Sequence, residues 1–224
     1  MCINSDTLKR RIQGVNELKD VVRTYRVYLS SRIPKLVEWL NNNSIFEKVY
    51  IINTHYELLK RSGEYFRFLV LEDALSNEHL ALMFQTAQRC DHDSKLAYYK
   101  IFQEVSRHMK KEQINFIIDQ ILETEGASVS CEDINLLYDL EKESNYFPLE
   151  KVLPFFERIF MNGKESDQIV ETCLKKYIDI VGSKDRKDTV KRFLGKLKDA
   201  QGKPDIVLRV LRTTIDAEYS RYDF

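Results

Sequence analysis

The residues whose side chains could act as nucleophiles or metal ligands are scattered along this chain. The sequence contains four cysteines, Cys2, Cys90, Cys131 and Cys173. They form no CxxC pair, so neither a zinc knuckle nor a dithiol redox motif is predicted. Cys90 lies close to His92 and Asp93, and thiolate and imidazole are good zinc ligands. A zinc site needs four convergent ligands, so we interpret this turn as a helix end followed by capping groups, and we predict no metal site.

The histidines and carboxylates also lack the spacings of familiar catalytic motifs. No HExxH, no GxSxG and no glycine-rich phosphate loop occurs. His55 and His79 fall near expected helix starts, where an imidazole can fill a polar boundary position. Glu141 and Glu143 belong to different faces of a charged helix end, where both are solvated. We therefore predict no catalytic residue, no cofactor and no small-molecule substrate.

A basic stretch near the C-terminal end could hold a negatively charged partner. Residues 184–203 carry eight basic side chains against three acidic ones. The apolar positions Val190, Phe193, Leu194 and Leu197 define an inward helix face, so the basic residues occupy the outward face that any soluble helix presents. No outward aromatic residues accompany them, which disfavours nucleic-acid binding. An acidic protein partner stays open as the alternative to a plain solvated face.

Two pairs of tyrosines suggest interaction surface. Tyr98, Tyr99, Tyr219 and Tyr222 are amphipathic side chains of the kind enriched at interfaces, although such rings also pack at helix boundaries and leave the hydroxyl in water. The chain ends at Phe224 without a clear cap, and an exposed apolar end on a helical array normally requires a further repeat or a capping helix. We therefore expect a piece, or a divergent stand-alone copy, of something longer.

Composition favours a helical, cytoplasmic protein. The 224 residues are 43% hydrophobic, which is enough to bury a core, and the 35 basic residues balance the 35 acidic ones. Only 7 Gly and 4 Pro are available for tight turns, so a β-sandwich or barrel is disfavoured. The N-terminus lacks the apolar region of a signal peptide, and no apolar run approaches the roughly 18 residues of a membrane span. We expect reduced thiols and no membrane contact.

Hydrophobic periodicity predicts the elements. Ser44 with Glu47, and Thr54 with Glu57, have the spacing of capping boxes. The helix after Ser44 is predicted to bury Ile45, Val49 and Ile52. The helix after Thr54 is predicted to bury Leu58, Leu59, Ser62, Phe66 and Leu69.

These helices are predicted to form an array. We expect eleven or twelve helices in a single domain over residues 1–224, with no strand. Helix pairs recur at approximately 35 to 45 residues, the period of HEAT and armadillo α-solenoids. No repeated sequence word is visible, so a compact irregular bundle stays open as the alternative. Trp39 and Phe66 are expected to lock adjacent helices.

Several residues along residues 36–122 resemble a known family. They are Glu38, Trp39, Leu40, Asn43, Ile45, His55, Phe66, Arg67, Phe68, Leu69, Ala74, Leu75, Ser76, Glu112, Gln113 and Ile114. This pattern resembles the armadillo-type helical region of the very large ubiquitin-specific proteases of the fat-facets type. Met83 and Phe84 stand where the family pattern has an Ile-Trp pair, an apolar-for-apolar departure.

The resemblance implies a non-catalytic scaffold, since this helical region lies outside the family's catalytic domain. None of the four cysteines has the Asn-x-Cys setting of the catalytic domain. We expect a protein partner, either a ubiquitin-pathway substrate or the catalytic domain of a longer chain. A nucleic-acid-binding helical array and a fragment with an unrecognised catalytic site are the alternative functions.

Overall fold

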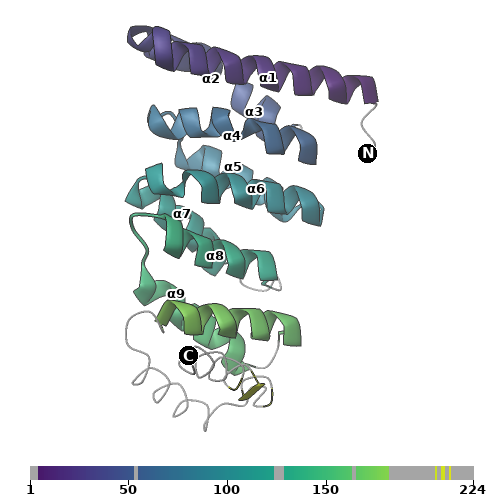
Figure 1. Ribbon diagram of the computed structural model, residues 1–224, viewed down its shortest axis with the longest axis vertical. Coiled ribbons are helices and arrows are strands. Elements are labelled where there is room, and N and C mark those ends of the chain that lie inside the picture. Colours follow the sequence, from purple (N-terminus) through teal and green to yellow (C-terminus); the bar gives the residue numbers. More distant parts are fainter. Residues whose placement is uncertain are drawn as a thin grey trace, which may run out of the picture. The chain divides into compact units, whose positions relative to one another are not determined.

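The structure, a computed structural model, describes residues 5–52, 55–123, 129–162 and 165–181, together with positions 205, 208, 209 and 212. The described residues form helices and turns, without a strand (Figure 1). The helices are α1 (Ser5–Tyr28), η1 (Ser30–Arg32), α2 (Ile33–Asn42), α3 (Ile45–Tyr50), α4 (Tyr56–Leu71), α5 (Asn77–Gln88), α6 (His92–Val105), η2 (Ser106–His108), α7 (Lys111–Leu122), α8 (Cys131–Glu143) and α9 (Leu149–Asn162). A tenth α-helix covers residues 167–181. The predicted all-α class is confirmed, and the helix expected over residues 190–197 lies outside the described residues.

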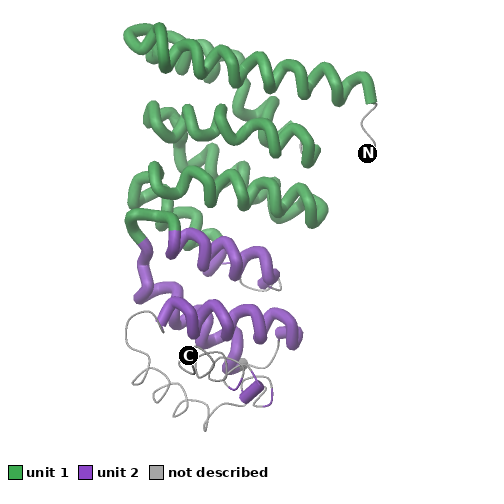
Figure 2. The backbone as a smooth tube through the Cα atoms, in the orientation of Figure 1, with its two compact units in different colours: residues 1–120, 143–146 green, residues 121–142, 147–224 purple. Residues whose placement is uncertain are grey.

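The chain divides into two compact units, coloured separately in Figure 2. Unit 1 consists of residues 1–120 and 143–146, and unit 2 of residues 121–142 and 147–224. Unit 1 therefore contains α1 to α6 and most of α7, whereas unit 2 contains most of α8, all of α9 and the helix at residues 167–181. The single domain over residues 1–224 stays a prediction.

The helices of unit 1 pack in two layers. The long helices α1, α4 and α6 form one layer, in which α4 packs against α1 on one side and α6 on the other (Figure 1). The short helix α3 contacts α2, α4 and α5, and α5 also contacts α6. Neighbouring helices in unit 1 therefore cover one another's apolar sides.

Burial in unit 1 follows the position of each helix in its layer. The stripe predicted for α4 is confirmed, because Leu58, Leu59, Ser62, Phe66 and Leu69 are all at most 1% exposed. Eight of the sixteen residues of α4 are buried. In the longer α1, two of the 24 residues are buried. Within this layer of unit 1, α1 packs against α4 alone, whereas α4 packs against both α1 and α6. One side of α1 is therefore covered in the layer, and two sides of α4 are covered.

The helix starts differ from the two predicted capping boxes. The prediction at Ser44 is wrong, since its hydroxyl makes no cap hydrogen bond and its backbone is left-handed, with φ of 50°. Ser44 is the second residue of a two-residue turn that joins α2 to α3: its N–H donates to the Asn41 carbonyl at 3.0 Å, and its own carbonyl accepts from the Lys48 N–H at 3.2 Å. Thr54 lies outside the described residues, and α4 is capped by His55, whose Nδ1 accepts from the Glu57 N–H at 3.2 Å.

Two large apolar residues that were predicted to be buried are exposed. Ile52 follows the end of α3 and is 63% exposed, and that short helix instead buries Phe46, Val49 and Tyr50. Trp39 is 54% exposed, so the prediction that it locks adjacent helices is wrong. Helix α2 is ten residues long and turns Leu36 and Leu40 inward, which leaves Trp39 on its flank.

We predict that Phe66 and Trp39 contribute very differently to stability. Phe66→Ala should lower the free energy of unfolding by about 3–5 kcal/mol, because it empties a fully buried ring site. Trp39→Ala should change it by less than about 1 kcal/mol, because the indole is largely in water. Urea denaturation of both variants measures the difference, and equal losses would contradict the packing described for α2 and α4.

Candidate functional site

The sequence candidate at Cys90, His92 and Asp93 is the start of a helix. Asp91 caps α6, with its Oδ1 accepting from the Ser94 N–H at 2.9 Å and its Oδ2 from the Ser94 hydroxyl at 3.1 Å. Cys90 is half-buried, and His92 and Asp93 are exposed in the first turn. This turn was predicted to follow the end of a helix, and its residues from Asp91 onward also cap and begin α6. In the described part of the chain, no three His, Cys, Asp or Glu side chains are grouped to hold a metal ion.

The two described cysteines of unit 2 occupy different surroundings. Cys173 is buried, its thiol donates to the Phe156 carbonyl at 3.5 Å, and desolvation raises the pKa of the thiol well above its usual value. The Cys131 sulfur lies 3.6 Å from the Thr172 hydroxyl. Neither of these cysteines is in a disulfide bond, and Cys2 lies outside the described residues. Cys173 is therefore held in its thiol form, which is a poor nucleophile.

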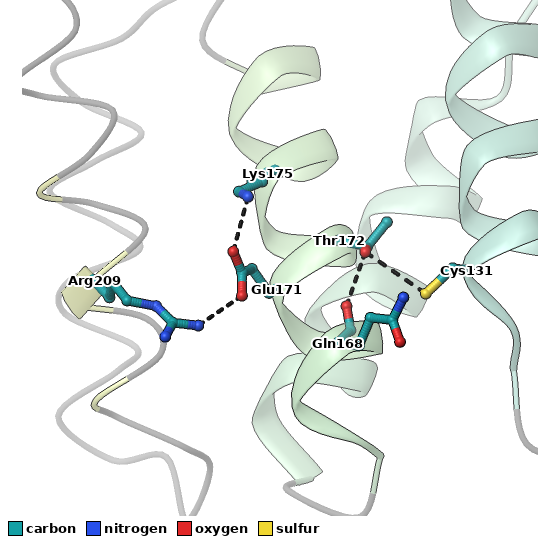
Figure 3. A network of polar contacts seen from close by, with 6 residues as sticks. All are labelled: Cys131, Gln168, Glu171, Thr172, Lys175 and Arg209. Carbon is teal, nitrogen blue, oxygen red and sulfur yellow. Dashed lines mark hydrogen bonds and ion pairs between the residues drawn. The ribbon is translucent and has the colours of Figure 1, made fainter.

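A polar network surrounds one face of the helix at residues 167–181 (Figure 3). Glu171 accepts from Lys175 at 2.8 Å and from Arg209 at 2.6 Å. The hydrogen bond from Lys175 is the largest cause of the lowered pKa of this carboxyl group. On the same helix, Thr172 donates to the Gln168 carbonyl at 2.8 Å. Because the half-buried Glu171 carboxylate is doubly paired, this network ties Arg209 to the helix at residues 167–181 and offers no free base.

The two tyrosines proposed as interaction surface near residue 98 belong to the core of unit 1. Tyr98 is fully buried and Tyr99 is 5% exposed. The Tyr98 hydroxyl donates to the Tyr50 carbonyl, and the Tyr50 hydroxyl donates to the Ser62 carbonyl at 2.9 Å. These bonds connect α6 to the end of α3 and α3 to the middle of α4, so their role is structural. Tyr219 and Tyr222 lie outside the described residues, as do residues 184–203 of the basic stretch.

Gln113 is a buried polar residue that sequence reasoning did not single out as structural. It is 5% exposed, its Nε2 donates to the Leu75 carbonyl at 3.0 Å, and its Oε1 accepts from the Lys110 N–H at 3.0 Å. One side chain thus caps α7 and holds the loop between α4 and α5. The sequence Lys-Lys-Glu-Gln at the start of α7 could have predicted this role, since Gln at the third position of a helix is a capping residue.

Unit 1 has surface hollows large enough to accept a side chain or a peptide. A groove of about 540 Å³ runs between α4 and α6, where Gly63 leaves room. A β-carbon at Gly63 would lie 3.3 Å from the Glu104 carboxylate, so a larger residue would narrow this groove. A second hollow, of about 320 Å³, lies between α1 and α4. Such volumes match those of binding sites, and their linings are open and of mixed charge.

None of the described helices combines the length and the apolar character required to cross a membrane. The geometry in the described residues consists of helix caps, buried tyrosine bonds and open hollows.

Comparison with known proteins gives a weak and partial similarity. The sequence is 24% identical over 94 residues to ubiquitin carboxyl-terminal hydrolase 34 of Homo sapiens, and the same figures hold for the Mus musculus protein. The aligned stretch covers 38% of this chain and 3% of each hydrolase. No protein-family model and no solved structure matches the chain. The predicted resemblance is therefore confirmed in part, as distant similarity to one region of a large ubiquitin carboxyl-terminal hydrolase, and the armadillo-type character of that region stays a prediction.

The histidine that caps α5 depends on its own neutral form. His79 Nδ1 accepts from the Ser76 N–H at 3.3 Å, and the Ser76 hydroxyl accepts from the His79 N–H at 3.2 Å. The imidazole stacks on Phe46, with ring centroids 4.3 Å apart. Desolvation lowers the pKa of His79, and the carboxylates of Glu47 and Glu78 oppose this shift. Protonation would remove the acceptor that closes the capping box.

We predict that His79 makes the stability of the chain sensitive to mild acid. Above the unfolded pKa of about 6.5, the ring is neutral in both states and its cap contributes fully. As the pH falls from there through the lowered folded pKa, the unfolded chain binds the proton first and stability is lost. His79→Gln keeps a capping side chain that does not titrate, and should cost less than about 1 kcal/mol at neutral pH.

The measurement is urea denaturation of wild type and His79→Gln across pH 7 to 5. The variant should lose less stability over this range than the wild type. His108, whose pKa is also lowered, is present in both chains and cancels from the difference. Parallel pH curves for the two proteins would show that His79 is not the responsible group.

Proposed function

We propose that this chain is a non-catalytic helical-repeat scaffold for protein–protein interaction, an α-solenoid of the HEAT or armadillo kind. In this proposal it corresponds to a helical segment of a large ubiquitin carboxyl-terminal hydrolase, outside the catalytic domain. Its mechanism is shape: stacked helix pairs present an extended surface that positions a protein partner. The partner is a ubiquitin-pathway substrate or the catalytic domain of a longer chain.

The observation that carries this proposal is the packing of α4 between α1 and α6, with the shorter helices α3 and α5 behind them. Helix pairs that each cover the next are the building principle of repeat arrays. The distant similarity to a deubiquitinase region supports the ubiquitin-pathway setting. That similarity spans 3% of the hydrolase, so the activity in its name is no part of what we propose for this chain.

The protonation state of the Cys173 thiol supports the non-catalytic part of this proposal. The buried Cys173 has a raised pKa and donates to a backbone carbonyl, which is opposite to the exposed, activated thiolate that a cysteine protease requires. Cys131 begins α8, and its sulfur lies 3.6 Å from the Thr172 hydroxyl, which is not a base that could activate a thiol.

A thiol-reactive ubiquitin probe tests the non-catalytic proposal. We expect no covalent labelling of the full chain after incubation with ubiquitin carrying a C-terminal electrophile, measured as a mass shift on intact-protein mass spectrometry. A catalytically competent deubiquitinase treated in parallel verifies the probe. If a cysteine is labelled, and its substitution with Ser abolishes the labelling, the non-catalytic proposal is wrong and the chain contains an active site.

Small-angle X-ray scattering tests the solenoid part of the proposal. A compact 224-residue domain has a radius of gyration of about 17 Å. A stacked array of helix pairs is elongated, so we expect a value above about 20 Å and an asymmetric pair-distance distribution. A value near 17 Å for the monomer would favour the compact irregular bundle instead.

A further inference from the structure

Positive side chains gather in unit 1 where α1, α4 and α6 end. Arg23 and Arg26 lie in the last two turns of α1, Arg67 lies near the end of α4, and Arg107 and His108 lie in η2 directly after α6. Partial desolvation, followed by the positive charges of Arg67, Arg107 and Arg26, lowers the pKa of His108. Guanidinium groups from three different elements therefore act on a single imidazole. We call these five residues the basic edge of unit 1.

Part of the basic edge has no internal counterion. Arg26 Nε lies 3.5 Å from Glu72, and an Arg107 nitrogen lies 3.4 Å from Glu143. Within the described residues, Arg23 and Arg67 form no ion pair. Cations at helix C-termini are favoured by the helix dipole, but that effect is small and screened at exposed sites. Two unpaired guanidinium groups beside two paired ones leave binding capacity for external carboxylates.

Apolar surface accompanies these charges. The hollow of about 320 Å³ between α1 and α4 is lined by Val22, Arg23, Arg26, Val27, Glu64 and Phe68. At its border Val27 is 63% exposed, and the adjacent Tyr28 is 79% exposed. A free inorganic anion would leave these side chains in water. A peptide that carries both carboxylates and an apolar side chain would contact both kinds of surface.

The carboxylates on the same surface argue against a polyphosphate ligand. Glu64 lines the hollow, and Glu72 and Glu143 are paired with members of the basic edge. A nucleic acid carries a charge at every nucleotide and would bring phosphates close to these groups. An acidic peptide can place uncharged residues opposite them, because its charges lie only on some side chains.

We propose that the basic edge binds an acidic peptide segment of a protein partner, with carboxylates at Arg23 and Arg67 and an apolar side chain against Val27. This inference rests on the proposed scaffold function and names the chemistry of the partner. His108 lies within the field of the same guanidinium groups, so a bound carboxylate would offset their effect on its imidazole.

Fluorescence polarisation with a defined probe tests this inference. The probe is a fluorescein-labelled twelve-residue peptide of Asp and Glu with two Leu residues, titrated with the full chain. Arg67→Glu should weaken binding by about tenfold or more, since it replaces an attraction with a repulsion at the centre of the basic edge. Arg61→Glu is the matched control: the same charge reversal on the same helix, at a residue paired with Glu57 at 4.0 Å, should change affinity less than about twofold.

Several results would overturn the inference. One is an equal loss of affinity in both variants, which would indicate a nonspecific effect of net charge. Another is unchanged binding of a control peptide with Asn and Gln in place of Asp and Glu. A third is displacement of the probe by inorganic phosphate or single-stranded RNA at lower concentration than by unlabelled peptide. Circular dichroism of both variants checks that they are folded to the same extent.

This outcome is separable from that of the scaffold proposal. A chain that resists the ubiquitin probe but does not bind the acidic peptide leaves the scaffold proposal in place and overturns the basic edge as its binding surface. A chain that is labelled by the ubiquitin probe overturns the scaffold proposal, whatever its affinity for the peptide.

Discussion

The packing of α4 between α1 and α6 is the interaction on which the rest of unit 1 depends. Phe66 illustrates how it works: its ring meets Phe102 of α6 edge-on, with centroids 5.9 Å apart, and Tyr50 of α3 in a similar geometry at 5.8 Å. One side chain thus joins three helices from both layers. Because helices this short are marginal by themselves, their mutual burial supplies most of the stability of each.

Buried polar bonds give this packing its register. Where a short helix ends inside the protein, its carbonyl groups need donors. Tyr98 supplies one to the Tyr50 carbonyl at the end of α3. Similar cross-element donors reach the Ser62 carbonyl in the middle of α4, from Tyr50, and the Leu75 carbonyl in the loop before α5, from Gln113. Each donor comes from a different element than its acceptor, so sliding one helix past the next would leave buried groups unsatisfied. A core held together only by apolar contacts would tolerate the sliding of one helix past the next more easily, because such contacts have little directional preference.

The residues that carry the family resemblance are mostly part of this framework. Leu40, Phe66, Phe68, Leu69 and Ile114 are each at most 1% exposed, and Ser76 and Gln113 cap helices. Similarity in such positions reports how helices pack and says little about what they bind. By contrast, Arg67 is exposed and unpaired in the described part of the chain, which makes it a candidate for function and not for folding.

The sequence by itself determined the all-α class, the apolar stripe of α4 and the helix starts near His55 and His79, because these follow from local periodicity and from polar side chains at helix ends. Only the tertiary structure decided that Ser44 turns left-handed between two helices and that Trp39 lies outside. It also decided that Tyr98 is a core donor and that arginines from α1, α4 and η2 lie close enough to His108 to lower its pKa. The reason is that an amphipathic pattern indicates which side of a helix is buried but does not indicate which helix buries it. The packing partner, and the charges that come together at helix ends, depend on contacts between residues that are distant in sequence.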